Sequence, residues 1–85
     1  MEEEVGRVTH FYPKISVAIV EMSGSLRVGD KIRIKGKTTD FTQVVESMQI
    51  EHKNIEEAKP GDVIGLKVNE RAREKDVVYK IVGEE

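Results

Sequence analysis

Short runs of alternating apolar and polar residues recur along the whole chain, and turn-forming residues separate them. The clearest is KIRIK at 31–35, where Ile32 and Ile34 share one side of a strand and the basic residues share the other. No long stretch has the apolar period of an amphipathic helix. The pattern therefore predicts an all-β protein with six strands, at residues 5–12, 15–22, 31–35, 41–51, 63–68 and 77–82.

Two of these runs do not alternate cleanly. Residues 15–22 are nearly continuous in apolar and small residues, which is typical of a strand covered on both sides. Either Val17 and Ile19 or Ala18 and Val20 face the core. In residues 41–51 the parity slips, which predicts a bulge or a strong bend, and residues 55–58 are compatible with a helical turn. The other residues expected in the core are Ile32, Ile34, Val44, Ile64, Leu66 and Val78.

Aspartate-containing corners precede three of the predicted strands. Gly29 and Gly61 can adopt a positive φ, and the aspartate that follows each can bond nearby backbone amides. In the second corner Pro60 also pre-sets the turn. These roles make Asp30 and Asp62 structural residues rather than a catalytic pair. The third corner has Lys75 where the others have glycine, so we expect a looser turn there.

Closure of the strands into a small barrel is expected because it removes exposed sheet edges. The chain has 85 residues, which is enough for one β-barrel domain over residues 1–85 and for little more.

Composition excludes several kinds of chemistry. The chain has no cysteine, so disulfides, thiolate metal sites and cysteine nucleophiles are absent. His10 and His52, the two histidines, lie far apart, and no serine has the context of a nucleophile. We therefore expect no catalytic residues, no metal, no cofactor and no enzyme activity. The acidic N-terminus has no apolar signal region and no apolar run is long enough to cross a bilayer, so no membrane contact and a cytoplasmic location are expected.

A basic row is the best candidate for a binding site. The side chains of Lys31, Arg33, Lys35 and Lys37 share one parity, and strand geometry puts neighbours about 7 Å apart. That spacing roughly suits successive phosphates of a nucleic acid. The alternative is an outward strand face whose charge protects an edge against pairing. The net charge of −2 argues against strong general binding of polyanions.

Three ordered segments resemble the second domain of translational GTPases such as elongation factor Tu and bacterial initiation factor two. They are SLRVGDKIRIKG at 25–36, VESMQIEHKNIEEAKPGDVIGLKV at 45–68 and REKDVVYKI at 73–81. The likeness covers about residues 5–82, and extends to small stand-alone translation elongation factor-like proteins and to a barrel appended to some collagenase-like peptidases. It implies a closed six-stranded Greek-key-like β-barrel. The phosphate-binding loop of a GTPase is absent, so GTP is not an expected ligand.

In the elongation factor an acidic residue early in the long strand helps to hold the 3′ end of aminoacyl-tRNA. Met48 stands at that position here, and Glu46 lies two residues earlier. The resemblance implies a non-catalytic binding module that contacts RNA, such as tRNA or rRNA, or docks onto a larger translation or peptidase-like protein. The alternative function is a protein-interaction barrel, either an accessory subunit or a homodimer, that makes no RNA contact.

Overall fold

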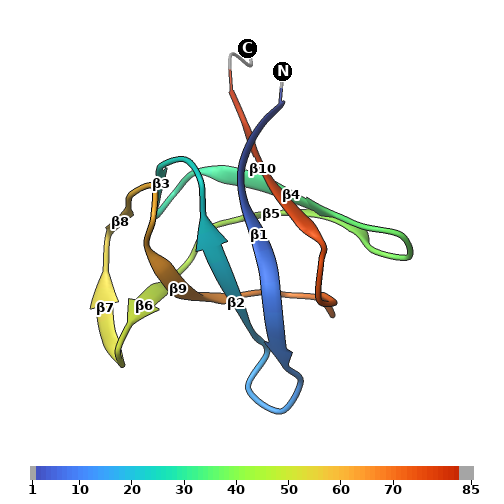
Figure 1. Ribbon diagram of the computed structural model, residues 1–85, viewed down its shortest axis with the longest axis horizontal. Helices are drawn as coiled ribbons and strands as arrows, with labels where there is room; N and C mark the ends of the chain where they lie inside the picture. Colours follow the sequence, from blue (N-terminus) through green and yellow to red (C-terminus); the bar gives the residue numbers. More distant parts are fainter. Residues whose placement is uncertain (1, 83–85) are drawn as a thin grey trace.

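The computed structural model describes residues 2–82, and this range contains ten strands and no helix. The all-β prediction is therefore confirmed, and no helix in the described range could cross a membrane. The strands are β1 (Glu2–Tyr12), β2 (Val17–Met22), β3 (Leu26–Arg27), β4 (Lys31–Lys35), β5 (Asp40–Val44), β6 (Met48–Ile50), β7 (Lys53–Ile55), β8 (Glu57–Ala58), β9 (Val63–Lys67) and β10 (Val77–Ile81) (Figure 1).

The six predicted strands are all present, with one divided in two. The predicted strand at 41–51 is interrupted at residues 45–47, so it forms β5 and β6 on either side of the expected bend. The helical turn at residues 55–58 is wrong, because this segment contains the end of β7 and the whole of β8. Strand β8 pairs with β3, where Leu26 lies opposite Ala58 in a two-residue ladder.

Eight strands form one antiparallel sheet in the order β5-β4-β10-β1-β2-β9-β6-β7. The long strand β1 lies in the middle of this order, between β10 and β2. Its register shifts once against each neighbour, between Glu4 and Gly6 and between Val8 and His10. Such irregularities bend a strand and increase its twist, so β1 can follow a strongly curved sheet.

The chain connectivity requires the sheet to roll up. Strand β5 forms one end of the sheet and β6 lies next to the other end, yet only residues 45–47 connect them. An extended chain gains at most about 3.6 Å per residue, so the two ends of the sheet must lie close together. No strand ladder joins these ends within residues 2–82, so the expected closed six-stranded barrel is not confirmed.

A buried glutamine bridges the open seam of the sheet. The side chain of Gln43 on β5 donates a hydrogen bond of 3.0 Å to the carbonyl of Lys67 on β9. Its carbonyl oxygen accepts a hydrogen bond of 2.7 Å from the N–H of Asn69. One side chain thus satisfies two backbone groups that a ladder would otherwise pair.

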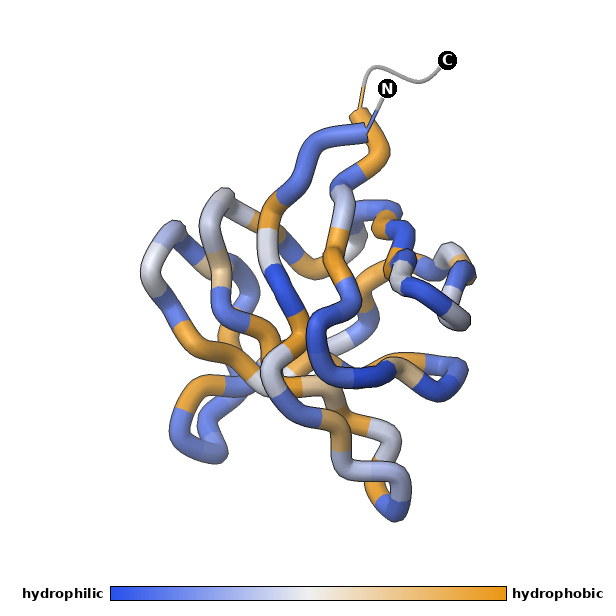
Figure 2. Tube along the Cα trace, turned by 45° about the vertical axis from the view of Figure 1, so that its right-hand side comes forward, coloured by the Kyte–Doolittle hydropathy of each residue, from blue (hydrophilic) through white to orange (hydrophobic). Residues whose placement is uncertain are grey.

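The core lies inside the rolled sheet, and apolar segments gather along its strands while polar residues gather in the turns (Figure 2). Ala18 and Val20 face this core, which settles the parity of β2. Val44 was predicted to be buried but is 49% exposed, because Phe41 and Gln43 take the inward positions of β5 and Val44 lies on its outer face. The other predicted core residues are confirmed: Ile32, Ile34, Ile64, Leu66 and Val78.

The three corners adopt one and the same turn. In each, the aspartate side chain accepts a hydrogen bond from the backbone N–H three residues earlier, at 2.8 or 2.9 Å. The residue before each aspartate has a positive φ, and these residues are Gly29 (100°), Gly61 (93°) and Lys75 (76°). The expectation of a looser third corner is therefore wrong: Lys75 takes the glycine conformation, and Asp76 is buried.

Candidate functional site

The predicted basic row lies on β4 and in the turn that follows it. Lys31, Lys35 and Lys37 are exposed, and the burial of Ile32 and Ile34 turns the cations of β4 outward as expected. Strand β4 is paired on both sides, with β10 and with β5. The row therefore lies on an outward strand face but does not protect a sheet edge.

Arg33, in the middle of the row, is engaged by acidic side chains. Its guanidinium donates two hydrogen bonds of 2.7 Å to the carboxylate of Asp40 and one of 3.0 Å to Glu2. The hydrogen bonds to Asp40, followed by that to Glu2, raise the pKa of Arg33 above its ordinary value. The same pairing with Arg33 lowers the pKa of Asp40. The row is thus divided, with Lys31 on one side of a neutralised arginine and Lys35 and Lys37 on the other.

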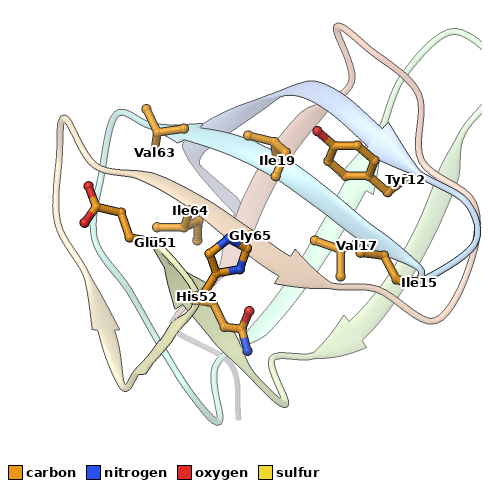
Figure 3. Close-up of a pocket in the computed structure, with 10 residues that line it drawn as sticks. Tyr12, Ile15, Val17, Ile19, Glu51, His52, Val63, Ile64 and Gly65 are labelled. Atoms are coloured by element: carbon orange, nitrogen blue, oxygen red, sulfur yellow. The ribbon is translucent and has the colours of Figure 1, made fainter.

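A mostly apolar pocket of about 250 Å³ lies on the outer face of β2, β9 and β6. Val17 and Ile19, the outward residues of β2, form one of its walls (Figure 3). Gly65 of β9 lies opposite Ile19 in the ladder and forms the floor. A Cβ atom at this position would lie 3.3 Å from Val17 Cγ1 and 3.9 Å from Ile19 Cδ1. A side chain at residue 65 would therefore occupy part of the pocket, which glycine leaves open.

Exposed apolar side chains gather at the rim of this pocket. Within residues 2–82 five large hydrophobic residues are exposed, and three of them, Tyr12, Ile15 and Val63, line the pocket. Ile15 is 61% exposed and Val63 is 55% exposed. Contiguous apolar surface of this kind marks a site of interaction more often than isolated exposed residues do.

The two turns that flank the pocket hold residues in an unfavourable backbone conformation. Ser16, in the turn between β1 and β2, has φ of 55°, and Glu51 and His52, in the turn between β6 and β7, have φ of 51° and 67°. Glu51 and His52 line the pocket themselves. Non-glycine residues at positive φ are uncommon and collect at functional sites. At Glu51 and His52 this conformation is that of a two-residue hairpin turn, so it fixes the rim of the pocket rather than marking a site by itself.

The position expected to meet a tRNA end does not face this surface. Met48 is fully buried, whereas Gln49, the next residue, lines the pocket. The sequence prediction missed the pocket because the parity of β2 was open. The continuous apolar run at 15–20 carried a signal, since Val17 and Ile19 are apolar on the outer face of the rolled sheet, which the rest of the described chain leaves partly uncovered.

The described residues show little that resembles a catalytic centre. Residues 2–82 contain no group of three histidine, cysteine or acidic side chains that could hold a metal ion. His10 lies 3.4 Å from the carboxylate of Glu74 and contacts the ring of Tyr12, with the ring centroids 4.5 Å apart. His52 lies in the turn at the rim of the apolar pocket, whereas His10 does not line that pocket, so the two histidines do not share a site.

The rolled antiparallel sheet with its three aspartate corners is that of a translation-factor β-domain. The chain belongs to the family described as Elongation factor Tu domain 2, which matches residues 17–79. A solved structure of the C-terminal domain of a U32 peptidase from Geobacillus thermoleovorans has the same fold, with a TM-score of 0.88 and 25% sequence identity. That alignment covers 94% of this chain and 93% of the other. The selenomethionine variant of the same domain gives a TM-score of 0.84 and covers 89% and 96%.

Curated relatives carry the same domain within longer chains. An uncharacterized protease of Methanocaldococcus jannaschii is 52% identical over 77 residues, which are 89% of this chain and 19% of the protease. A collagenase of Porphyromonas gingivalis is 36% identical over 78 residues, which are 89% of this chain and 22% of the collagenase. The chain thus spans about a fifth of the length of the curated relatives that it matches.

These findings correct one expectation from the sequence. The prediction that the protein is not an enzyme is contradicted by the names of its relatives, which are protease, collagenase and U32 peptidase. The chain is homologous to the C-terminal domain of U32 peptidases, which is one part of those longer proteins. Its resemblance to translation factors, by contrast, is confirmed at the level of the fold.

Proposed function

We propose that this chain acts as the accessory β-domain of a U32-type peptidase and contacts the peptidase-like part through its apolar pocket. The observation that carries this proposal is the 52% identity to one fifth of a protease, since nearly the whole chain corresponds to one segment of that larger protein. The exposed side chains of Tyr12, Ile15 and Val63 supply apolar surface for such a contact. Burial of apolar area is the main driving force of protein association.

A chimera tests the proposal directly. In it, this chain replaces the matching segment of the Methanocaldococcus jannaschii protease, and Gly65→Leu then fills the pocket floor. Differential scanning calorimetry of the chimera should show the β-domain and the remainder unfolding in one transition, because docked domains stabilise each other. The Gly65→Leu chimera should show two transitions.

The matched control changes an exposed apolar residue outside the pocket. Val44→Leu adds a methylene at a site that is 49% exposed and does not line the pocket, and it should leave the single transition unchanged. If the parent chimera already melts in two independent steps, or if Gly65→Leu has no effect on the coupling, docking through this pocket is refuted.

A second candidate function is contact with RNA through the lysines of the basic row. The observation that favours it is the exposure of Lys31, Lys35 and Lys37, none of which forms an ion pair within residues 2–82. Each lysine that neutralises a phosphate steepens the salt dependence of binding. Replacement of the three lysines by glutamine should flatten the slope for single-stranded RNA by about 2. Unchanged RNA affinity in this variant would exclude the row as a contact.

A further inference from the structure

The third corner of the domain holds a lysine in a backbone conformation that favours glycine. The first two corners make the same hydrogen bonds and have Gly29 and Gly61 at the position that Lys75 occupies in the third. Nothing lies within 4 Å of a Cβ built at either glycine, so these positions are conformationally demanding but not crowded. A side chain at such a φ is strained whatever the space around it. The fold alone therefore gives no reason for lysine at residue 75.

Lys75 borders a hollow on the surface of the domain. This hollow of about 370 Å³ is lined by Lys37 and Thr38 from the turn after β4, and by the whole corner before β10, which is Arg73, Glu74, Lys75 and Asp76. The two segments are brought together because β10 pairs with β4, with Val77 opposite Lys35. Figure 1 shows this turn and this corner on the same side of the molecule.

The two acidic residues of the hollow, Glu74 and Asp76, each have another partner within the described residues. Asp76 is 3% exposed, and its carboxylate accepts a hydrogen bond of 2.8 Å from the N–H of Arg73. Glu74 also lines the hollow, and its carboxylate lies 3.4 Å from Nδ1 of His10. In the described part of the chain, Lys37, Arg73 and Lys75 form no ion pair. Three cations and two carboxylates from two segments thus border one cavity, and none of the three cations forms an ion pair with either carboxylate.

We propose that this hollow binds a phosphate group. Lys37, Arg73 and Lys75 supply the positive charge, and the hydroxyl of Thr38 supplies a hydrogen-bond donor. Lys75 completes the set, which explains a strained lysine where the sister corners have glycine. This site is independent of the proposed docking of a peptidase domain. It shares Lys37 with the basic row and includes Arg73 and Lys75, which the row does not contain.

Two probes distinguish a free phosphate from the phosphodiester of a nucleic acid. The ¹⁵N-labelled protein is titrated with inorganic phosphate at low ionic strength, and in a second arm with a short single-stranded RNA. The amide resonances of Lys37, Thr38, Arg73 and Lys75 should shift in a saturable manner. Saturation by inorganic phosphate alone identifies a free-phosphate site, whereas tighter binding of RNA identifies a backbone phosphate. Either result supports the proposal, and no saturable shift with either probe overturns it.

Variants of residue 75 separate its charge from its backbone conformation. Lys75→Asn removes the charge but keeps a residue that tolerates a positive φ, so the fold should be retained. We expect this variant to lose saturable phosphate binding and to flatten the salt slope for RNA by about 0.7, the value for one lost contact. Lys75→Arg should keep both the saturable phosphate binding and the salt slope of the parent protein. Lys59→Asn, at the first residue of the second corner, is the charge-matched control and should change neither.

Three results would overturn the site. Unchanged binding in Lys75→Asn of the probe that saturates the hollow, whether inorganic phosphate or RNA, is one of them. Equal loss in Lys59→Asn is the second, because it would show a dependence on net charge alone. Binding of a short polyglutamate peptide as tightly as RNA is the third, since the hollow would then not select phosphate. Loss of RNA affinity in Lys31→Gln but not in Lys75→Asn would support the basic row and refute the hollow, so the two ideas fail separately.

Discussion

Arg33 on β4 holds Asp40 on β5 by two parallel hydrogen bonds of 2.7 Å, diagonally across the strand ladder. The diagonal arises because Arg33 lies opposite Thr42, and Asp40 is two residues further along the same face. A planar guanidinium matches a carboxylate in this bidentate geometry. The arginine at the centre of the predicted basic row is therefore a cross-strand clasp.

This pair predicts a pH dependence of stability. The pKa of Asp40 is lowered in the folded protein by its hydrogen bonds to Arg33, from an ordinary value of 3.8. A lowered pKa means that the pair stabilises the fold above pH 3.8 and that this contribution is lost as the pH falls through the folded value. Asp40→Asn should lack this acid-sensitive contribution. Thermal melting of both proteins from neutral to acid pH measures the difference.

The effect at Asp40 should be small, because the pair is exposed and screened by solvent. Added salt should reduce it further. If the melting temperatures of the parent and the variant differ by the same amount at neutral pH and in strong acid, the ion pair makes no contribution of this kind.

The glutamine at the seam predicts a second effect on stability. Gln43→Ala leaves the carbonyl of Lys67 and the N–H of Asn69 without their partner. Unsatisfied buried groups cost about 1–3 kcal/mol each at most, so a loss of about 2 kcal/mol in the free energy of unfolding is expected. Urea denaturation measures this loss. Gln49→Ala, which removes an exposed side chain, should cost less than about 0.5 kcal/mol. Equal losses would show that Gln43 does not hold the seam.

Exchange of residues between two corners predicts opposite changes. Lys75→Gly relieves a positive φ that costs a non-glycine residue about 1–2 kcal/mol, and this exceeds the roughly 0.5–1 kcal/mol of extra chain entropy that glycine loses. We therefore expect Lys75→Gly to stabilise the domain by about 0.5–1 kcal/mol, and Gly61→Lys to destabilise it by a similar amount. Thermal denaturation should show shifts of a few degrees in each direction. Destabilisation by Lys75→Gly would mean that the lysine has a structural role.

The buried aspartate of the third corner should matter more than its counterparts. Asp76 is 3% exposed and packs so closely on Gly36 that a Cβ atom at residue 36 would collide with its carboxylate. Asp76→Ala removes the acceptor of the Arg73 N–H and leaves a cavity, for an expected cost of about 2–3 kcal/mol. Asp62→Ala, at a half-buried corner, should cost about 1 kcal/mol. Chemical denaturation that ranks the two variants the other way would contradict this assignment.

Local pattern was sufficient for the strands and for most of the core. The alternation of KIRIK fixed the orientation of Ile32 and Ile34 because one face of a strand is either buried or exposed as a whole. The same reasoning failed at Val44, since the inward positions of this segment are Phe41, Gln43 and Val45, and Val44 was assigned to the wrong face. Strands β3, β7 and β8 were missed because ladders of two or three residues depend on partners brought together by the fold.

The candidate sites depend on contacts between segments distant in sequence. Arg33 meets Glu2 from a strand 31 residues earlier, and no periodicity in the sequence indicates this partner. The phosphate hollow joins Lys37 to Lys75 only because β4 and β10 are neighbours. The apolar pocket likewise requires β2, β9 and β6 to be adjacent. Sequence identified Lys37 as a candidate but could not show which cations share a cavity with it.

The pairing of β1 with β10 also has a consequence for the order of events during synthesis. Glu2 lies opposite Ile81, so the middle of the sheet joins the beginning of the described chain to its end. On the ribosome, β1 has only its hairpin partner β2 until β10 has emerged. The sheet can then be completed only in a late step, after a long loop has been closed. Until that step β1 and β4 each lack the neighbour that β10 supplies, and unpaired strand edges of this kind favour aggregation.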